Sequence, residues 1–118
     1  MLIKVLKSKL HRARVTESKL HYPGSIEIDE DLMWAAGIVP YEAVAVADVT
    51  NGNRLETYAV PGEPGSGRIV VLGAAAQLIK PMDVIIIFSY ALCTPDEAGE
   101  LVPRVVVLDE NNRIVKPQ

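Results

Sequence analysis

Short stretches in which apolar and polar residues alternate dominate the chain and predict strands. The first stretch, residues 1–16, has a two-residue period that places Lys9, His11, Ala13 and Val15 on one face. Further strands are expected at 25–28, 43–49, 54–60, 68–72, 84–88, 103–108 and 113–115. Turn residues separate these stretches about every eight to twelve positions, which is typical of a small β-barrel or sandwich.

Local signals for turns and helices lie between the strands. Asn51-Gly52 separates two apolar stretches and is the strongest short signal for a hairpin. Asp29 is a good helix N-cap and Gly37 suits the position after a last turn, so we expect a helix over Glu30–Ala36. Other turns or short helices are expected at 61–67, 73–76, 81–83, 94–97 and 109–112.

Composition and charge narrow the class of protein. The 118 residues carry 12 Lys and Arg against 15 Asp and Glu, a net charge of −3, and 49% are hydrophobic. This is too apolar for a disordered chain and lacks the basic excess of a nucleic-acid binder. The longest uncharged stretch, 84–95, is too short to span a membrane, and no signal-peptide pattern is found. We therefore expect one cytoplasmic domain over residues 1–118.

The cysteine content and the apolar excess add two expectations. Cys93 is the one cysteine, and no Cys/His set has metal-ligand spacing, so neither a disulfide nor a metal is expected. Cys93 is expected to pack as a small apolar side chain. A chain this short and apolar has more apolar residues than one small core can hold, which favours a homo-oligomer.

The first candidate for chemistry is the Gly24-Ser25 pair. It follows His21 and Tyr22, two bulky groups that can hydrogen-bond, and Pro23. Proline fixes one backbone angle and glycine frees the next, so the Ser25 hydroxyl could be held against the Gly24 carbonyl. A surface turn with an aromatic anchor explains the same residues. The chain contains a second such pair, Gly65-Ser66, in a plain Gly/Pro loop, which serves as an internal comparison.

The second candidate is the predicted strand 54–60. Arg54, Glu56 and Tyr58 share one of its faces, and an arginine with a phenol could hold an anion and move a proton. Thr57 faces the other way unless the strand ends or bulges there. An ordinary amphipathic hairpin arm is the alternative.

Two weaker candidates complete the set. Small residues from Gly73 to Ala76 could leave backbone N–H groups open to an anion or a carbonyl oxygen, although close packing also favours small residues. Lys9 and His11 could be ligands, or simply solvent-facing or core residues.

Taken together, these features resemble the aspartate 1-decarboxylase family of pyruvoyl-dependent enzymes. The matching segments are Lys9–Arg12, Leu20–Ser25, Ala35–Ile38, Val49–Gly52, Arg54, Thr57–Ala59, Gly65-Ser66 and Gly73–Ala76. The resemblance implies a mainly β fold, a small six-stranded double-psi β-barrel with short helices. It also implies a homotetramer with sites at subunit interfaces and a role in pantothenate biosynthesis.

The resemblance further implies self-cleavage into residues 1–24 and 25–118. Attack of Ser25 on the Gly24 carbonyl, with Thr57 as the oxyanion donor, would leave a covalent pyruvoyl group at residue 25. That group would form a Schiff base with L-aspartate, which would lose CO₂ and give β-alanine, with Tyr58 as the proton donor. The family uses neither a metal nor pyridoxal phosphate.

The resemblance also assigns substrate-binding residues. These are Lys9 from an adjacent subunit, Arg54, Thr57, Gly73, Ala74 and Ala75. An arginine and a lysine as anchors predict an acidic substrate, although a pyruvoyl decarboxylase for another amino acid is an alternative. No nucleic-acid or membrane partner is expected, and maturation is either spontaneous or assisted by an accessory factor.

Two positions depart from the family pattern. Leu72 stands where the family usually has Asn, and Pro64 stands where an Arg commonly precedes Gly-Ser. Leucine cannot hydrogen-bond to the cleavage site. The alternative reading is therefore an unprocessed, non-catalytic barrel that acts as a scaffold or binding module.

Overall fold

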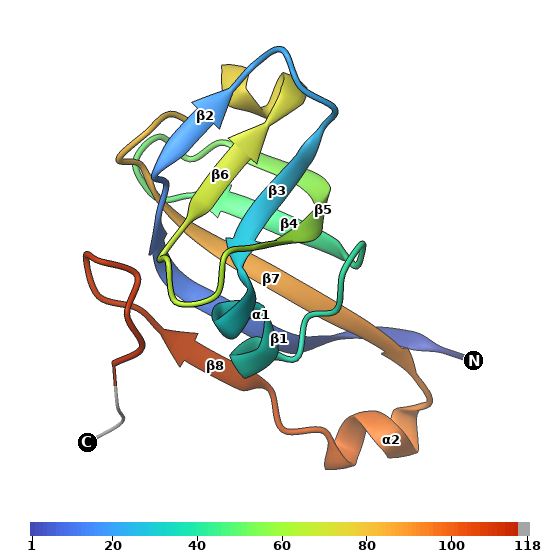
Figure 1. Ribbon diagram of the computed structural model, residues 1–118. Coiled ribbons are helices and arrows are strands. Elements are labelled where there is room, and N and C mark those ends of the chain that lie inside the picture. The colour runs from blue at the N-terminus through green and yellow to red at the C-terminus, as the bar shows by residue number, and fades with distance from the viewer. Residues whose placement is uncertain (116–118) are drawn as a thin grey trace.

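The computed structural model describes residues 1–115, and strands are its main regular structure (Figure 1). The strands are β1 (Ile3–Arg14), β2 (Glu17–Lys19), β3 (Ser25–Asp29), β4 (Ala43–Asp48), β5 (Arg54–Gly62), β6 (Ile69–Leu72), β7 (Val84–Cys93) and β8 (Arg104–Val107). The helices are α1 (Glu30–Ala36), α2 (Pro95–Glu100) and the 3₁₀ turn η1 (Gly73–Gln77). The mainly β fold with short helices is therefore confirmed.

The strands close into a small barrel because β1 and β2 form one bent path. The order of pairing is β2-β6-β3-β5-β4-β7-β1-β8, so the path 3–19 pairs with β7 through β1 and with β6 through β2. At the bend, the Thr16 amide donates to the Ile69 carbonyl at 2.8 Å. Counting β1 and β2 as one, six strands surround the core, as expected. The additional strand, β8, lies outside the ring beside β1.

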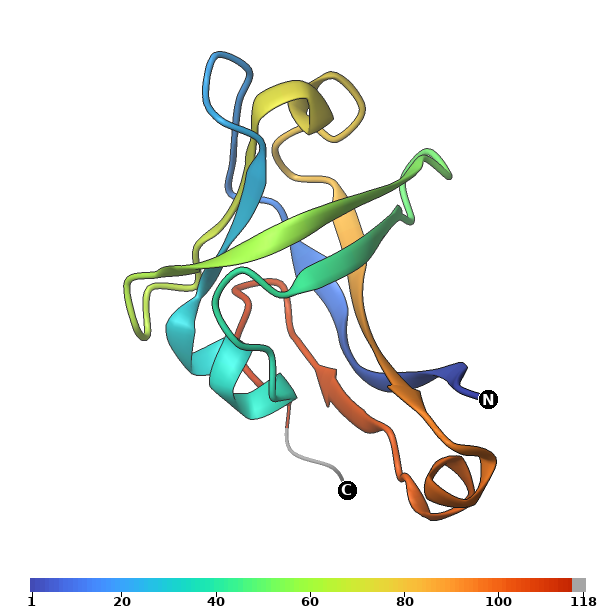
Figure 2. The same cartoon turned by 90° about the vertical axis from the view of Figure 1, so that its right-hand side faces the viewer.

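The barrel has two distinct ends. The β2–β3 loop and η1 lie at one end, whereas α2 and β8 lie at the other (Figures 1 and 2). Apolar side chains fill the interior between them, and the largest fully buried ones are Leu10, Val15, Ile26, Ile28, Val44, Val46, Ile69, Val70, Val71, Ile79, Ile85 and Ile87. Each contributes about 1.5–3 kcal/mol through burial.

Local signals account for the helix and the first hairpin. The Asp29 carboxylate accepts from the Asp31 amide at 2.9 Å, and Gly37 ends α1 in the left-handed conformation with φ 69°. β4 and β5 pair without interruption from Ala43↔Tyr58 to Ala47↔Arg54, around the predicted turn. These segments form as predicted because neighbouring residues determine them.

The strict alternation predicted along the first strand is wrong. Register shifts interrupt the pairing of β1 with β7, and one of them lies between Leu10 and Ala13. Arg12 there has φ 66°, so one extra residue is accommodated and the faces exchange. Ala13 therefore shares the core with Leu10, whereas Lys9 and His11 stay only partly buried on the other face.

Two smaller differences from the predicted strands lie in the last third of the chain. β7 runs to Cys93, five residues beyond the predicted end at Phe88, and Cys93 is half-buried. The predicted strand 113–115 is wrong, because only a single bridge, Leu108↔Ile114, forms there.

Among residues 1–115, no helix has the length and apolar character needed to cross a membrane.

Candidate functional site

A pocket of about 480 Å³ lies at the end of the barrel where β3 begins. Its lining comes from the segment before β3, from β5 and from the region of η1. The lining residues are Gly24, Leu55, Glu56, Thr57, Tyr58, Leu72, Ala74, Ala75 and Leu78. The pocket therefore brings together residues from three of the segments singled out in the sequence.

The open edge of β5 explains why four consecutive residues line the pocket. The segment Arg54–Tyr58 pairs with β4 on one side, whereas pairing with β3 on the other side begins only at Ala59. The unpaired edge borders the pocket, so residues from both faces of the strand reach it. Thr57 and Tyr58 consequently share the site although β5 neither ends nor bulges at Thr57, which were the two conditions expected from the sequence.

Gly73 packs directly against the predicted cleavage site. It has φ 80°, and a β-carbon at this position would lie 2.6 Å from the Gly24 Cα and 2.9 Å from the Tyr22 carbonyl oxygen. Any larger residue would displace the backbone of Gly24. The next residue, Ser25, is 5% exposed and pairs with Leu72 in the β3–β6 ladder. The Leu72 backbone therefore fixes the register of Ser25, although the Leu72 side chain is apolar and cannot hydrogen-bond to it.

Tyr58 is the phenol of the pocket. It is 37% exposed, and its ring lies 6.2 Å from the ring of Tyr41. It follows Thr57 on β5, and both residues line the pocket together with Gly24. A residue with a hydroxyl group, a residue with a phenol group and the glycine before Ser25 thus line one cavity.

The two predicted cationic anchors lie outside this lining. The Arg54 guanidinium lies 5.6 Å from the centre of the Phe88 ring, and Lys9 pairs with the same Phe88 in the β1–β7 ladder. Both belong to the outer face of the sheet formed by β5, β4, β7 and β1. A single chain therefore does not bring Lys9 to Gly24.

Sequence reasoning missed three lining residues, Leu55, Glu56 and Leu78, as parts of the pocket. Glu56 carried a usable signal, since it shares a strand face with Arg54 and Tyr58. Leu78 carried none. Its carbonyl accepts from the side chains of Asn51 at 3.2 Å and Asn53 at 2.9 Å. The hairpin turn therefore holds this wall of the pocket in place.

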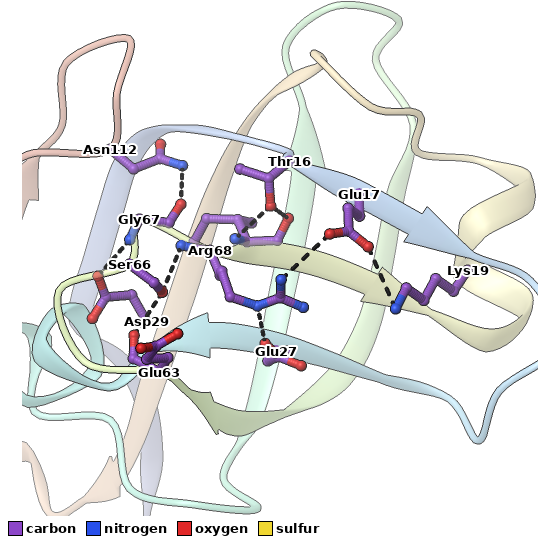
Figure 3. Close-up of polar contacts among 11 residues, drawn as sticks. Thr16, Glu17, Lys19, Glu27, Asp29, Glu63, Ser66, Gly67, Arg68 and Asn112 are labelled. Carbon is purple, nitrogen blue, oxygen red and sulfur yellow. Dashed lines mark hydrogen bonds and ion pairs between the residues drawn. The ribbon is translucent and has the colours of Figure 1, made fainter.

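A cluster of ion pairs stabilises the strands behind the pocket (Figure 3). Arg68 Nε lies 2.6 Å from Glu27 on β3, and Arg68 Nη1 lies 3.3 Å from Glu17 on β2. The hydrogen bond and charge of Glu27 raise the pKa of Arg68 above its ordinary value. Lys19 extends the cluster with a 3.4 Å contact to Glu17. The cluster joins the strand that begins at Ser25 to its neighbours.

His11 lies apart from the pocket. Burial, followed by the charges of Lys9 and Arg12, lowers its pKa, and its Nδ1 atom is buried without a hydrogen-bond partner among residues 1–115. These features describe a half-buried histidine on β1 whose pKa is lowered. They do not place it with Thr57 and Tyr58.

Comparison with known proteins identifies the class of protein. A family model described as aspartate decarboxylase matches residues 1–115. The chain is 53% identical over 116 residues to an aspartate 1-decarboxylase of Salinibacter ruber, covering 98% of this chain and 80% of the relative. It is 54% identical to that of Caldicellulosiruptor saccharolyticus and 55% identical to that of Acetivibrio thermocellus, in each case covering 98% of this chain and 91% of the relative.

The barrel, the pocket and these similarities together define an enzyme of the carboxy-lyase class. The chain belongs to the aspartate decarboxylase family. The alternative of a non-catalytic scaffold receives no support from the comparisons.

Proposed function

We propose that the chain cuts itself between Gly24 and Ser25 and that the mature enzyme decarboxylates L-aspartate to β-alanine. The observation that carries the proposal is that Gly24 shares one pocket with Thr57 and Tyr58. The names of the relatives supply the substrate and the reaction.

The residues at the cleavage site suit a shift of the chain from nitrogen to oxygen. The Ser25 hydroxyl attacks the Gly24 carbonyl, and the amide becomes an ester with a free amino group on residue 25. Gly24 has no β-carbon to obstruct this approach. Thr57 lines the same pocket and donates to the oxygen that gains charge.

Elimination of the ester then separates the two pieces. Residue 24 leaves as a carboxylate, and residue 25 becomes dehydroalanine, which water converts to a pyruvoyl group with release of ammonia. The products are residues 1–24 and 25–118. The residues present fit this group, because Gly73 and the Leu72 backbone hold position 25 at the rim of a pocket wide enough for an amino acid.

When formed, the pyruvoyl group supplies a ketone that takes the substrate amine and accepts the electron pair left by CO₂. The remaining functions belong to the side chains. Tyr58 borders the pocket with its phenol and delivers the proton that completes the product. The backbone of Gly73, Ala74 and Ala75 faces the substrate across the same cavity.

Aspartate carries two carboxylates, and Arg54 and Lys9 are the proposed anchors. Arg54 belongs to the strand whose edge borders the pocket. In this proposal, Lys9 contributes to the pocket of a neighbouring subunit in a homotetramer. Large apolar side chains remain exposed on the single chain, including Trp34 at 83% and Leu92 at 69%. Their burial against other subunits favours such an assembly.

The proposal includes a cytoplasmic location and a place in pantothenate biosynthesis, both implied by the family. An accessory factor for maturation is part of it as well. Because Leu72 offers no side-chain hydrogen bond to the cleavage site, we expect slow maturation that such a factor would accelerate.

The test of this function is turnover by the Arg54→Ala variant. We expect it to cleave itself normally and to lose aspartate decarboxylation by at least about 100-fold, because a bidentate anchor is removed. Arg12→Ala, at an exposed bulge, is the matched control and should keep normal turnover. Normal decarboxylation by Arg54→Ala would remove this arginine from substrate binding. Failure of the unaltered protein to decarboxylate L-aspartate would refute the proposed function itself.

A further inference from the structure

A second pocket, of about 640 Å³, lies between the turn after β8 and the end of β1. It shares no lining residue with the pocket at Gly24. Two arginines, Arg14 and Arg113, and one acidic residue, Glu110, are its charged lining residues. The volume is in the range of about 300–1,000 Å³ typical of small-molecule sites.

Several hydrogen bonds hold the walls of this second pocket in a fixed arrangement. The Arg14 amide donates to Asn112 Oδ1 at 2.7 Å, and Asn112 Nδ2 donates to the carbonyls of Arg14 and Gly67, both at 2.8 Å. The contact with Gly67 is drawn in Figure 3. Asn112 is 2% exposed, so this junction of three segments is buried.

The remaining walls are tied in the same way. Met82 donates its amide to the Val15 carbonyl at 2.8 Å, and Arg113 Nη1 donates to the Gly65 carbonyl at 2.8 Å. The Asp29 carboxylate holds the Gly67 amide at 2.8 Å. The pocket is therefore preorganised rather than a gap between loose loops.

The arginines of this pocket lack the carboxylate partners that Arg68 has. Arg68 contacts both Glu27 and Glu17, whereas neither Arg14 nor Arg113 forms an ion pair within residues 1–115. Arg14 Nε is buried and has no hydrogen-bond partner there. In a chain with more acidic than basic residues, carboxylates were available to pair with these arginines. A buried guanidinium donor without a partner is unfavourable, so a bound acceptor would stabilise it.

We infer that this pocket binds a small phosphorylated molecule, with Arg14 and Arg113 holding the phosphate oxygens. Planar guanidinium groups match phosphate geometry with paired hydrogen bonds. The pocket is larger than one phosphate group, and Glu110 at its wall can accept a hydrogen bond from a hydroxyl or amine of the same ligand. The Asp109 carboxylate feels the charge of Arg113 but forms no ion pair with it within residues 1–115, and its Oδ1 accepts from the amides of Asn111 and Arg113 within the turn.

The experiment is calorimetric titration of the full-length protein with inorganic phosphate, pyrophosphate and ADP, with succinate as a carboxylate probe. We expect pyrophosphate or ADP to bind with a Kd well below about 1 mM, and succinate to bind at least about tenfold more weakly. Arg14→Met and Arg113→Met should each weaken binding by about tenfold or more. Arg12→Met is the control, since it removes the same charge outside the pocket and should change Kd less than about twofold.

The Glu110→Gln variant should have the opposite effect on the affinity for pyrophosphate. Removing the acidic charge should tighten pyrophosphate binding by a few-fold, because only one carboxylate opposes the two arginines there. If Arg14→Met fails to fold, Arg113→Met still tests the inference, because Arg113 is exposed and its replacement should not disturb the core. Absence of binding by all phosphorylated probes, or equal binding by Arg113→Met and the unaltered protein, would overturn the inference. Neither result bears on cleavage at Gly24, which the mass of the protein reports separately.

Discussion

The chain contains two Gly-Ser pairs, and the structure places them in different surroundings. Ser25 is 5% exposed at the start of β3, with Gly73 packed against the preceding Gly24. Ser66 is exposed, donates its hydroxyl to the Glu63 carbonyl at 2.6 Å and accepts from the Arg68 amide at 3.2 Å. The Gly65 carbonyl, which a Ser66 hydroxyl would have to attack, already accepts from Arg113 at 2.8 Å.

This difference shows that the dipeptide alone does not define a cleavage site. At 24–25, Gly24 lines a cavity that Thr57 and Tyr58 also line. At 65–66 the serine is engaged in a turn, and the loop amides are held by Asp29. Cleavage chemistry requires a free hydroxyl, an accessible carbonyl and a donor for the developing charge, and the proposed site meets these needs better.

The largest expected effect comes from replacing each of the two serines with alanine, one at a time. Ser25→Ala should remain one chain of 118 residues with no decarboxylase activity, because both the attacking hydroxyl and the source of the pyruvoyl group are lost. Ser66→Ala should cleave and turn over normally. Intact mass and an assay for β-alanine measure both variants. Cleavage of Ser25→Ala between residues 24 and 25 would show that the break has another origin.

The second largest effect is expected from a variant that disturbs the contact between Gly73 and Gly24. Gly73→Ala places a β-carbon 2.6 Å from the Gly24 Cα at φ 80°, which costs roughly 1–3 kcal/mol and shifts the cleavage site. We expect the rate of cleavage to fall by at least about tenfold. Gly99→Ala, where nothing lies within 4 Å of the new carbon, should mature at the normal rate. Equal maturation rates of the two variants would contradict the importance of this contact.

A third variant separates maturation from turnover. Tyr58→Phe should cleave itself but decarboxylate about 100-fold more slowly, because the proton donor is missing. Tyr41→Phe is the matched control, since the Tyr41 ring lies 6.2 Å from the Tyr58 ring, tilted by 34°, and Tyr41 does not line the pocket. Steady-state kcat for mature protein measures the effect. Undiminished kcat in Tyr58→Phe would assign the proton to another group.

The smallest expected effect concerns Asp48, which begins the hairpin turn that holds Leu78 in the pocket wall. Burial of Asp48, followed by the neighbouring carboxyl group of Asp83, raises the pKa of Asp48 from 3.8 to about 6. The folded state therefore holds an extra proton between these values. The associated stability is present below about pH 4 and is lost as pH rises through about 6.

Asp83→Asn should flatten this pH dependence and raise stability near neutral pH by about 1 kcal/mol. Urea unfolding across this range, in the uncut Ser25→Ala background, is the measurement. The exposed Asp96→Asn serves as the control and should leave the slope unchanged. A slope in Asp83→Asn as steep as in the control would disprove the coupling between the two carboxyl groups.

Sequence reasoning predicted the parts of the fold that neighbouring residues determine. Asp29 and Gly37 marked α1, and Asn51-Gly52 marked the hairpin, because capping and turn formation are local. The bulge at Arg12 and the closure of the barrel at Thr16 could not be predicted in this way. Both depend on register with β7 and β6, which are distant in sequence.

The candidate site was predicted to a similar extent. Gly24, Thr57, Tyr58, Ala74 and Ala75 lie around one pocket, although Thr57 reaches it through an open strand edge rather than a bulge. Leu78 was missed because its place depends on contacts with Asn51 and Asn53 across the fold. Lys9 lies outside this pocket, and its predicted contact with substrate rests on the proposed assembly of subunits.

The most direct test of the central claim is the intact mass of the unaltered protein before and after treatment with hydrazine. The account predicts two pieces, residues 1–24 and 25–118, and a hydrazone on the larger piece at its first residue. A single chain that stays uncut on prolonged warming, or a larger piece that begins with an ordinary serine and forms no adduct, would contradict the account.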